Sequence, residues 1–196
     1  MTAALSSLDD LGLADKQDWT VDDLASLPKD LRYELLHGRL VLSSPKTFHQ
    51  WVAHKVASAL EVNEPEDVYV VQDLSIAVDG RNRPRPDVVV VPDNEDESFP
   101  PSAGDVLLAV EVVSPDSTIR DRRTKVKLYA YAGIPVYWVI DPLGDEIVFK
   151  EHILGHDGEY HLGLARGGRI RLDRPWPVTL DLDAWQARRE RSRRAR

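Results

Sequence analysis

The sequence contains no cysteine among its 196 residues. This absence excludes disulfide bonds, and it also excludes metal sites built from thiolates. A metal ion bound by this chain must therefore take its side-chain ligands from Asp, Glu or His.

Long apolar runs are absent as well. The longest of them, residues 88–91 and 106–110, are far shorter than the roughly 20 residues needed to span a bilayer. No basic segment precedes an apolar stretch in the manner of a secretion signal. We therefore expect a soluble, cytoplasmic protein without a membrane partner.

Positive charge is scarce, with 25 Lys and Arg against 33 Asp and Glu and a net charge of −8. This balance argues against broad nonspecific adhesion to nucleic acid, because Lys and Arg supply most of that binding. Six of the basic residues lie in 188–196, which leaves 19 basic and 32 acidic residues in 1–187. We predict a basic C-terminal tail over 186–196 that is either simply solvated or a phosphate-binding arm. It has no apolar periodicity to bury, so we expect folding not to need it.

The composition is that of a globular protein, with 42% hydrophobic and 30% charged residues. The length fits one domain. Because residues 1–17 show no sustained periodicity, we predict a loose N-terminal segment there and a single domain over 18–185.

The first part of that domain predicts a short helix and a β-hairpin. A capped helix is expected over 20–27. Two strand-like runs over 32–44 flank His37 and Gly38, and glycine tolerates the positive φ of a tight turn. Glu34 falls on the first of these strands.

The rest of the domain predicts helices packed on a mixed β-sheet, which makes the fold class α/β. The expected core elements are a helix over 47–62, strands over 68–78, 87–91 and 106–113, a helix over 118–132 and a strand over 136–140. The last three form a βαβ unit, so their two strands should be parallel. Short antiparallel strands are expected from there to about Leu182.

Two acids stand out by their position in this pattern. Asp87 opens an apolar strand, and Glu111 interrupts the most apolar stretch of the chain. A carboxylate in such a strand is costly unless it is paired, hydrogen-bonded or bound to a cation. Each acid alone could simply be solvated at a strand end, but two of them on successive core strands favour a shared site.

The helix after Glu111 offers a lysine to that site. At 100° per residue, Lys125 lies beside an apolar stripe that includes Ile119, Val126 and Tyr129. Lys125 either extends along the sheet toward the acids or forms a solvated pair with Asp121 four residues earlier. A basic rim for phosphates is a further possibility; its candidate residues are Arg81, Arg83, Arg85, Arg120, Arg122 and Arg123.

An ordered set of short segments resembles the Uma-two family of candidate bacterial restriction endonucleases, within the PD-(D/E)xK nuclease superfamily. The matching residues span about 18–185 and are Tyr33 to Gly38, His49, Arg85 to Val90, Val110 to Pro115, Asp121, Lys125, Tyr129 and Gly133 to Asp141. A lone Pro-Asp dipeptide is weak evidence, but this ordered set is specific.

The resemblance implies a restriction-endonuclease-like fold in which Asp87 and Glu111 are the catalytic acids. The superfamily's lysine is expected two residues after the second acid, where this chain has Val113. The resemblance implies that Lys125 on the following helix takes that role. It also implies that Glu34 on the hairpin is an auxiliary catalytic acid.

Phosphodiester hydrolysis needs a nucleophilic hydroxide and relief of negative charge, and a cation such as Mg²⁺ or Mn²⁺ can supply both. Mg²⁺ prefers oxygen ligands, so we expect Asp87, Glu111 and the Val112 carbonyl to hold it. Lys125 would orient the attacking water, and His49 is expected to be a structural helix residue rather than a base. The expected partners are DNA and a second copy of the chain, because two sites cut both strands of a duplex most simply.

Two other functions fit the same residues. One is a catalytically silent DNA-binding or complex-forming module with the nuclease fold, which Val113 and the acidic composition favour. The other is a metal-dependent hydrolase of a different phosphate ester, which would need a closed pocket rather than a groove of DNA width.

Overall fold

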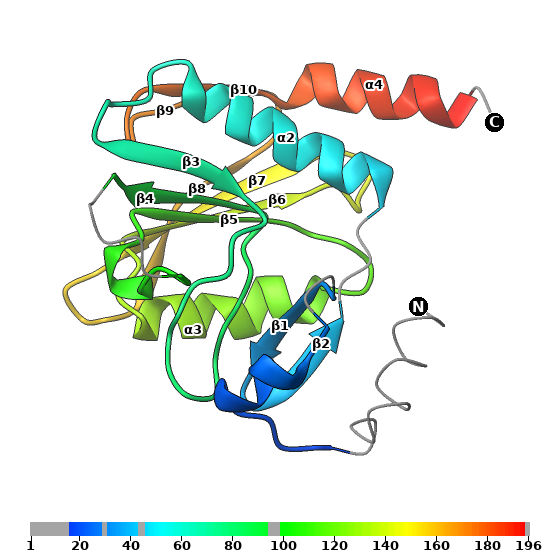
Figure 1. The fold of residues 1–196 in the computed structure, drawn as a ribbon. Helices are drawn as coiled ribbons and strands as arrows, with labels where there is room; N and C mark the ends of the chain where they lie inside the picture. The colour runs from blue at the N-terminus through cyan, green and yellow to red at the C-terminus, as the bar shows by residue number, and fades with distance from the viewer. Residues whose placement is uncertain (1–15, 29–30, 43–45, 94–98, 195–196) are drawn as a thin grey trace.

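Figure 1 shows the computed structural model, which describes residues 16–28, 31–42, 46–93 and 99–194. A central β-sheet lies between layers of helices, and a hairpin near the N-terminus stands beside it. The predicted α/β fold class, a mixed sheet flanked by helices with an N-terminal helix and hairpin, is confirmed. Most of the segment predicted to be loose, 1–17, lies outside the described residues.

The central sheet has six strands in the order β3-β4-β5-β6-β7-β8. These strands are β3 Val68–Gln72, β4 Val88–Pro92, β5 Leu108–Val112, β6 Val136–Asp141, β7 Val148–Leu154 and β8 Tyr160–Arg166. β5 and β6 pair in parallel, as the predicted βαβ unit requires, and the other neighbours are antiparallel. Smaller two-stranded sheets pair β1 Tyr33–Leu36 with β2 Arg39–Leu42, and β9 Arg169–Leu172 with β10 Val178–Asp181.

Helices cover both faces of the central sheet (Figure 1). They are η1 Asp22–Ser26, α2 Thr47–Glu61, η2 Ala103–Asp105, η3 Arg120–Thr124, α3 Lys125–Tyr131 and α4 Leu182–Arg194. Val112 of β5 packs in the cluster that contains α2, whereas Ala109 packs with Tyr129 of α3. Side chains alternate along a strand, so Glu111 points toward the α3 layer. None of the helices among the described residues is long and apolar enough to cross a membrane.

The N-terminal hairpin turns where the sequence predicts. His37 and Gly38 both have positive φ angles, 51° and 73°, which is the backbone of a tight hairpin turn. A Cβ at Gly38 would lie 2.4 Å from the exposed, flexible end of Arg81, which can move aside, so the positive φ is the main reason for glycine there. The hairpin brings Glu34, on β1, close to the segment that leads into β4, since the Arg85 backbone N–H donates to its carboxylate at 3.3 Å.

The strand predicted over 68–78 is shorter than expected. β3 ends at Gln72 because Asp73 adopts a positive φ of 57°, which turns the chain out of the sheet. The chain then runs out to the hairpin, where Arg83 bridges Leu35 of β1. The excursion, residues 73–87, therefore ties the hairpin to the central sheet and returns to it at Asp87.

The helix predicted over 118–132 is present, and Tyr129 and Ala130 of its predicted apolar stripe are buried, but Ile119 is not. Its first part, η3, is a π-turn, and α3 continues from it. Ile119, expected on the buried stripe, is 73% exposed, whereas Asp121 and Lys125 are buried. A π-turn has more residues per turn than an α-helix, so the 100° spacing fails across it.

The predicted basic tail is helical over residues 186–194, and one of its arginines is buried rather than simply solvated. It belongs to α4, and Arg189 in its middle is only 5% exposed. The Arg189 guanidinium donates to the backbone carbonyls of Pro142, Gly144 and Asp145 in the loop after β6. Apolar periodicity does not reveal this contact because polar hydrogen bonds bury the residue.

We therefore expect Arg189→Ala to lower the free energy of unfolding by about 1–3 kcal/mol, since it removes the donor to three carbonyl groups. Urea denaturation measures the change. The exposed neighbour Arg188 gives a matched control, for which Arg188→Ala should stay within about 0.5 kcal/mol of the unchanged protein. Equal stability of the two variants would show that α4 does not depend on this anchor.

Candidate active site

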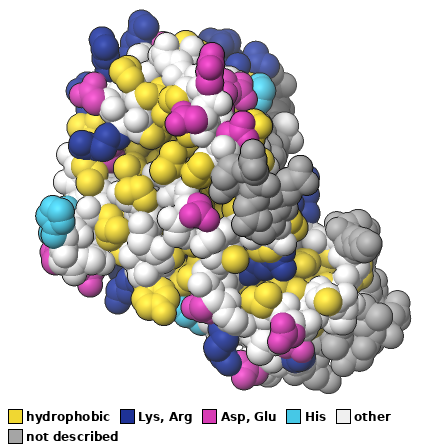
Figure 2. All heavy atoms as spheres, turned by 60° about the vertical axis from the view of Figure 1, so that its left-hand side comes forward, with side chains coloured by type: hydrophobic (Ala, Val, Ile, Leu, Met, Phe, Trp, Pro, Cys, Tyr) yellow, Lys and Arg dark blue, Asp and Glu magenta, His cyan; other side chains and the backbone are white. Residues whose placement is uncertain are grey.

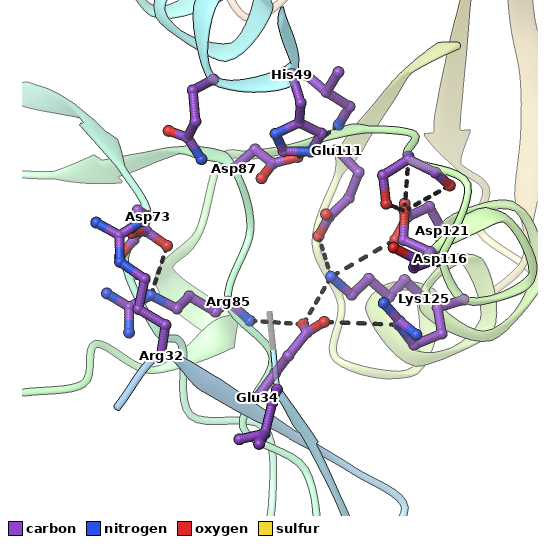
Figure 3. Close-up of a pocket in the computed structure, with 16 residues that line it drawn as sticks. Arg32, Glu34, His49, Asp73, Arg85, Asp87, Glu111, Asp116, Asp121 and Lys125 are labelled. Atoms are coloured by element: carbon purple, nitrogen blue, oxygen red, sulfur yellow. Dashed lines mark hydrogen bonds and ion pairs between the residues drawn. The ribbon is translucent and has the colours of Figure 1, made fainter. Parts of the chain in front are cut away.

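A cavity of about 310 Å³ lies where the hairpin, α2, the adjoining ends of β4 and β5, and the η3–α3 helix meet. Figure 3 shows that charged side chains from these elements point into it. The cavity is lined by Arg32, Glu34, Leu42, His49, Gln50, Asp73, Arg85, Asp87, Glu111, Val112, Ser114, Asp116, Ser117, Arg120, Asp121 and Lys125. The residues predicted from the sequence as a site, including Val112, all belong to this lining.

Asp87 and Glu111 reach the cavity from neighbouring antiparallel strands. β4 and β5 pair with Val88 opposite Val110, and the Asp87 N–H donates to the Val110 carbonyl at 3.0 Å. Continued by one residue, this register places Asp87 across from Glu111. The Val112 N–H donates to Asp87 Oδ2 at 2.7 Å and so fixes the carboxylate at the start of β4.

Lys125 lies between two acids from different parts of the chain. Its Nζ is 2.7 Å from Glu111 Oε1 and 2.8 Å from Glu34 Oε2 (Figure 3). The Tyr129 hydroxyl also donates to Glu111 Oε1, at 2.8 Å, and the Arg85 N–H donates to Glu34 Oε2 at 3.3 Å. Lys125 is 2% exposed, so its ammonium is bound within the site rather than solvated beside Asp121.

Asp121 belongs to the same cluster, although the sequence suggested at most a surface pair with Lys125. It is 1% exposed, and its Oδ1 lies 3.8 Å from the Lys125 Nζ. The Ser117 hydroxyl donates to Asp121 Oδ2, but Asp121 Oδ1 has no hydrogen-bond partner among the described residues. Asp121 lies four residues before Lys125, so the two side chains share the face of the helix that is turned to the cavity.

Carboxyl groups outnumber the single ammonium in the buried part of the cavity. Burial raises the pKa of Glu111 well above its usual value, and it raises the pKa of Asp121 to about 6. Burial would lower the pKa of Lys125, but the charges of Glu111, Glu34 and Asp121 outweigh it, so the pKa is raised and the ammonium stays charged. One ammonium among several carboxylates leaves the site able to accept a further cation.

His49 lines the cavity from α2. Its Nε2 is 3.2 Å from Asp87 Oδ2. Burial would lower the pKa of His49, but the hydrogen bond and charge of Asp87 outweigh it, so the pKa is raised. Its contact with the carboxylate makes His49 a support for Asp87, a role that its place in the helical pattern did not indicate.

The predicted basic rim is only partly present. Arg85 and Arg120 line the cavity, whereas Arg81 pairs with Asp18 in the hairpin region and Arg122 pairs with Asp141.

Arg32 and Asp73 join the cavity without having been predicted. Asp73 binds the Arg85 Nε at 2.7 Å and Arg32 Nη1 at 2.9 Å. Figure 3 shows this group across the cavity from Asp121. These two residues were missed because the sequence around Asp73 has the composition of a continuous strand. The positive φ at Asp73, which turns the chain there, is visible only in the structure.

The chemistry of these residues fits a hard divalent cation. The available donors are carboxylate and carbonyl oxygens, and Asp121 Oδ1 is a buried oxygen without a partner among the described residues. No group of three or more Asp, Glu or His in the described part of the chain is already arranged as a metal cage. Mg²⁺ does not require one, since it commonly binds one or two carboxylates and keeps several waters.

Comparisons with known proteins agree on one group. The model of the family Uma2, described as "Putative restriction endonuclease", matches residues 21–174. Among solved structures, the chain is similar to a protein of Anabaena variabilis described as "a putative nuclease belonging to DUF820", with a TM-score of 0.64 and 16% identity. The match covers 85% of this chain and 98% of that one, and it shows a common fold. No curated protein matches the sequence.

Proposed function

The chain belongs to the Uma2 family of restriction-endonuclease-like proteins, and we propose that it is a divalent-metal-dependent endonuclease that hydrolyses phosphodiester bonds in DNA. One observation carries the proposal: Asp87 and Glu111, from adjacent strands, share a cavity with the buried ammonium of Lys125. The description of the Anabaena variabilis protein as a nuclease supports the same reaction.

In this proposal Asp87, Glu111 and the carbonyl of Val112 hold Mg²⁺ or Mn²⁺. When bound, such a cation would supply an acidified water and neutralise charge on the phosphate. Glu34 keeps Lys125 in place through the contact of 2.8 Å. Lys125 then holds the attacking water and offsets the negative charge that develops on the phosphate oxygens.

The low exposure of these residues strengthens each charge interaction. Glu34, Glu111 and Lys125 are 4%, 3% and 2% exposed. Charges interact more strongly where water is excluded. The Lys125 ammonium therefore acts on a bound phosphate with little screening.

DNA must approach without help from the net charge. The face of the molecule in Figure 2 mixes acidic, basic and hydrophobic side chains, and its described Lys and Arg residues form no continuous band. The arginines that line the cavity, Arg32, Arg85 and Arg120, are the proposed contacts to phosphates. A homodimer remains our proposal for cutting both strands, and light scattering of the purified protein measures the mass that decides it.

A catalytically silent module is the second candidate function, and one observation favours it. The Lys125 ammonium already bonds Glu111 at 2.7 Å, which occupies one oxygen that a cation would need. Such a protein would bind DNA without cutting it.

Incubation with supercoiled plasmid and with single-stranded DNA separates the two candidates. We expect strand cleavage in Mg²⁺ or Mn²⁺ and none in EDTA. Binding of DNA without cleavage in either metal would support the silent module, and cleavage that persists in EDTA would contradict the metal requirement.

Divalent cations should also raise the melting temperature. A ligand that binds the native state alone, at about 100 times its dissociation constant, stabilises it by roughly 2.7 kcal/mol. Thermal melting in Mg²⁺ or Mn²⁺ against EDTA measures the shift, which should be several degrees. A melting curve that saturating cation leaves unmoved would contradict a native metal site.

A further inference from the structure

Two features of the η3–α3 helix have no role in the mechanism above. Its first part is a π-turn, and π-turns in proteins are short, uncommon and frequent at functional sites. The π-turn carries Asp121, whose Oδ1 is buried and has no hydrogen-bond partner among the described residues. A buried carboxylate oxygen without a hydrogen-bond partner lowers the stability of the fold. Such a cost suggests that Asp121 has a functional role.

Two hydrogen bonds hold Asp121 in place. The Ser117 hydroxyl donates to Oδ2, and the Tyr137 hydroxyl donates to the backbone carbonyl of Asp121 at 2.8 Å. Oδ1 is left facing the Lys125 Nζ at 3.8 Å, which is too long for a hydrogen bond. The same Nζ bonds Glu111 at 2.7 Å and Glu34 at 2.8 Å.

The Lys125 ammonium is therefore bonded to two carboxylates, Glu111 and Glu34. A third acceptor, Asp121 Oδ1, has no partner among the described residues and lies within a short movement of the ammonium. A divalent cation at Glu111 would compete with the Lys125 ammonium for the same carboxylate. The two positive charges repel each other at close range. Lysine has a flexible stem and a compact charge, so its ammonium can shift without movement of the helix.

We propose that Asp121 is a positioning residue that receives the Lys125 ammonium when a divalent cation takes the Glu111 carboxylate. This proposal rests on the proposed function. In it, Lys125 keeps Glu34, exchanges Glu111 for Asp121 Oδ1, and remains charged beside the bound phosphate. Asp121 and Lys125 are four residues apart, so both side chains lie on the face of the helix that lines the cavity.

The role predicts that Asp121 affects cation binding through Lys125 and not directly. In Asp121→Asn the displaced Lys125 ammonium meets a neutral amide instead of a carboxylate, so cation binding should weaken by about tenfold. This factor is within the range of coupling energies between contacting charged residues. In a Lys125→Met background there is no ammonium to receive, and Asp121→Asn should change the dissociation constant by less than about twofold. Asp116→Asn removes an exposed acid of the same cavity and controls for a general effect of charge.

Calorimetric titration with Mn²⁺ measures the four dissociation constants of this double-mutant cycle. Equal weakening by Asp121→Asn in both backgrounds would make Asp121 a direct ligand or a remote charge, and it would overturn the positioning role while leaving the metal site intact. Weakening by Asp116→Asn as large as that by Asp121→Asn would overturn the role as well. An unchanged protein that binds no Mn²⁺ would overturn the positioning role together with the proposed metal requirement.

Lys125→Met removes a buried charge and can fail to fold, so a second measurement uses the unchanged protein. Because Lys125 is buried and ion-paired, we expect its ammonium protons to exchange slowly enough with water to be followed by ¹H–¹⁵N NMR with and without Mg²⁺. We expect its signal to shift on addition of Mg²⁺ and to shift differently in Asp121→Asn. A signal that saturating Mg²⁺ leaves in place would contradict the proposal.

Discussion

Asp87→Asn and Glu111→Gln should each reduce DNA cleavage at least 100-fold. The neutral side chains keep nearly the same volume but lose the charge that holds the cation, and even changes outside the ligands of a metal often cost about 10- to 100-fold in affinity or activity. Asp87→Asn should also fold normally, because the Val112 N–H can donate to the amide oxygen as it does to the carboxylate. Initial rates on supercoiled plasmid in Mg²⁺ measure the effect.

The matched control for this loss is Glu159→Gln. Glu159 is an exposed acid next to β8 that does not line the cavity, so its neutralisation changes the net charge equally. We expect cleavage by this variant to stay within about twofold of the unchanged protein, as for surface substitutions in general. If Glu159→Gln were as inactive as Asp87→Asn, the cavity would not be the site of the reaction.

Lys125→Met should have the largest effect on stability. The substitution replaces a buried ammonium by an apolar chain of similar length and leaves Glu34 and Glu111 without the cation that both contact. Breaking a buried ion pair by removal of one partner typically costs about 3–5 kcal/mol. Denaturation by urea in EDTA measures the free energy of unfolding, and added Mg²⁺ should recover part of the loss.

Lys127 provides the comparison for this prediction. It lies on the same helix, two residues later, and is exposed, so Lys127→Met should change the free energy of unfolding by about 0.5 kcal/mol or less. Similar stability of the two variants would mean that the buried ammonium contributes nothing to folding, and the charge arrangement described here would be wrong.

The fold was largely predictable because its main elements obey local rules. His37 and Gly38 carry the turn chemistry of a hairpin, and the apolar strands and helix between Val106 and Ile140 predict a parallel pair that the structure confirms. β3 was predicted too long because Leu74 to Val78 have the composition of a strand, whereas the backbone at Asp73 turns out of the sheet. Tertiary contact with the hairpin decides that conformation, and no local pattern encodes it.

The candidate site was predictable only where an acid interrupts an apolar strand. Asp87 and Glu111 carry that signal, and their roles remain predictions. Asp121 carries no such signal, because it sits in a helix with many charged neighbours, where its spacing from Lys125 fits a solvated pair as well as a buried one. Arg189 was missed for a related reason, since it is buried by hydrogen bonds to carbonyl groups rather than by apolar packing.

Titration of Mn²⁺ into the metal-free protein tests the central claim most directly, because it asks whether Asp87 and Glu111 hold a cation without requiring cleavage. We predict saturable binding to the unchanged protein and at least tenfold weaker binding to both Asp87→Asn and Glu111→Gln. Loss of a metal ligand should weaken binding at least as much as loss of a residue that supports a ligand, which costs about tenfold or more. Binding of equal strength to all three proteins, or to none of them, would contradict the account.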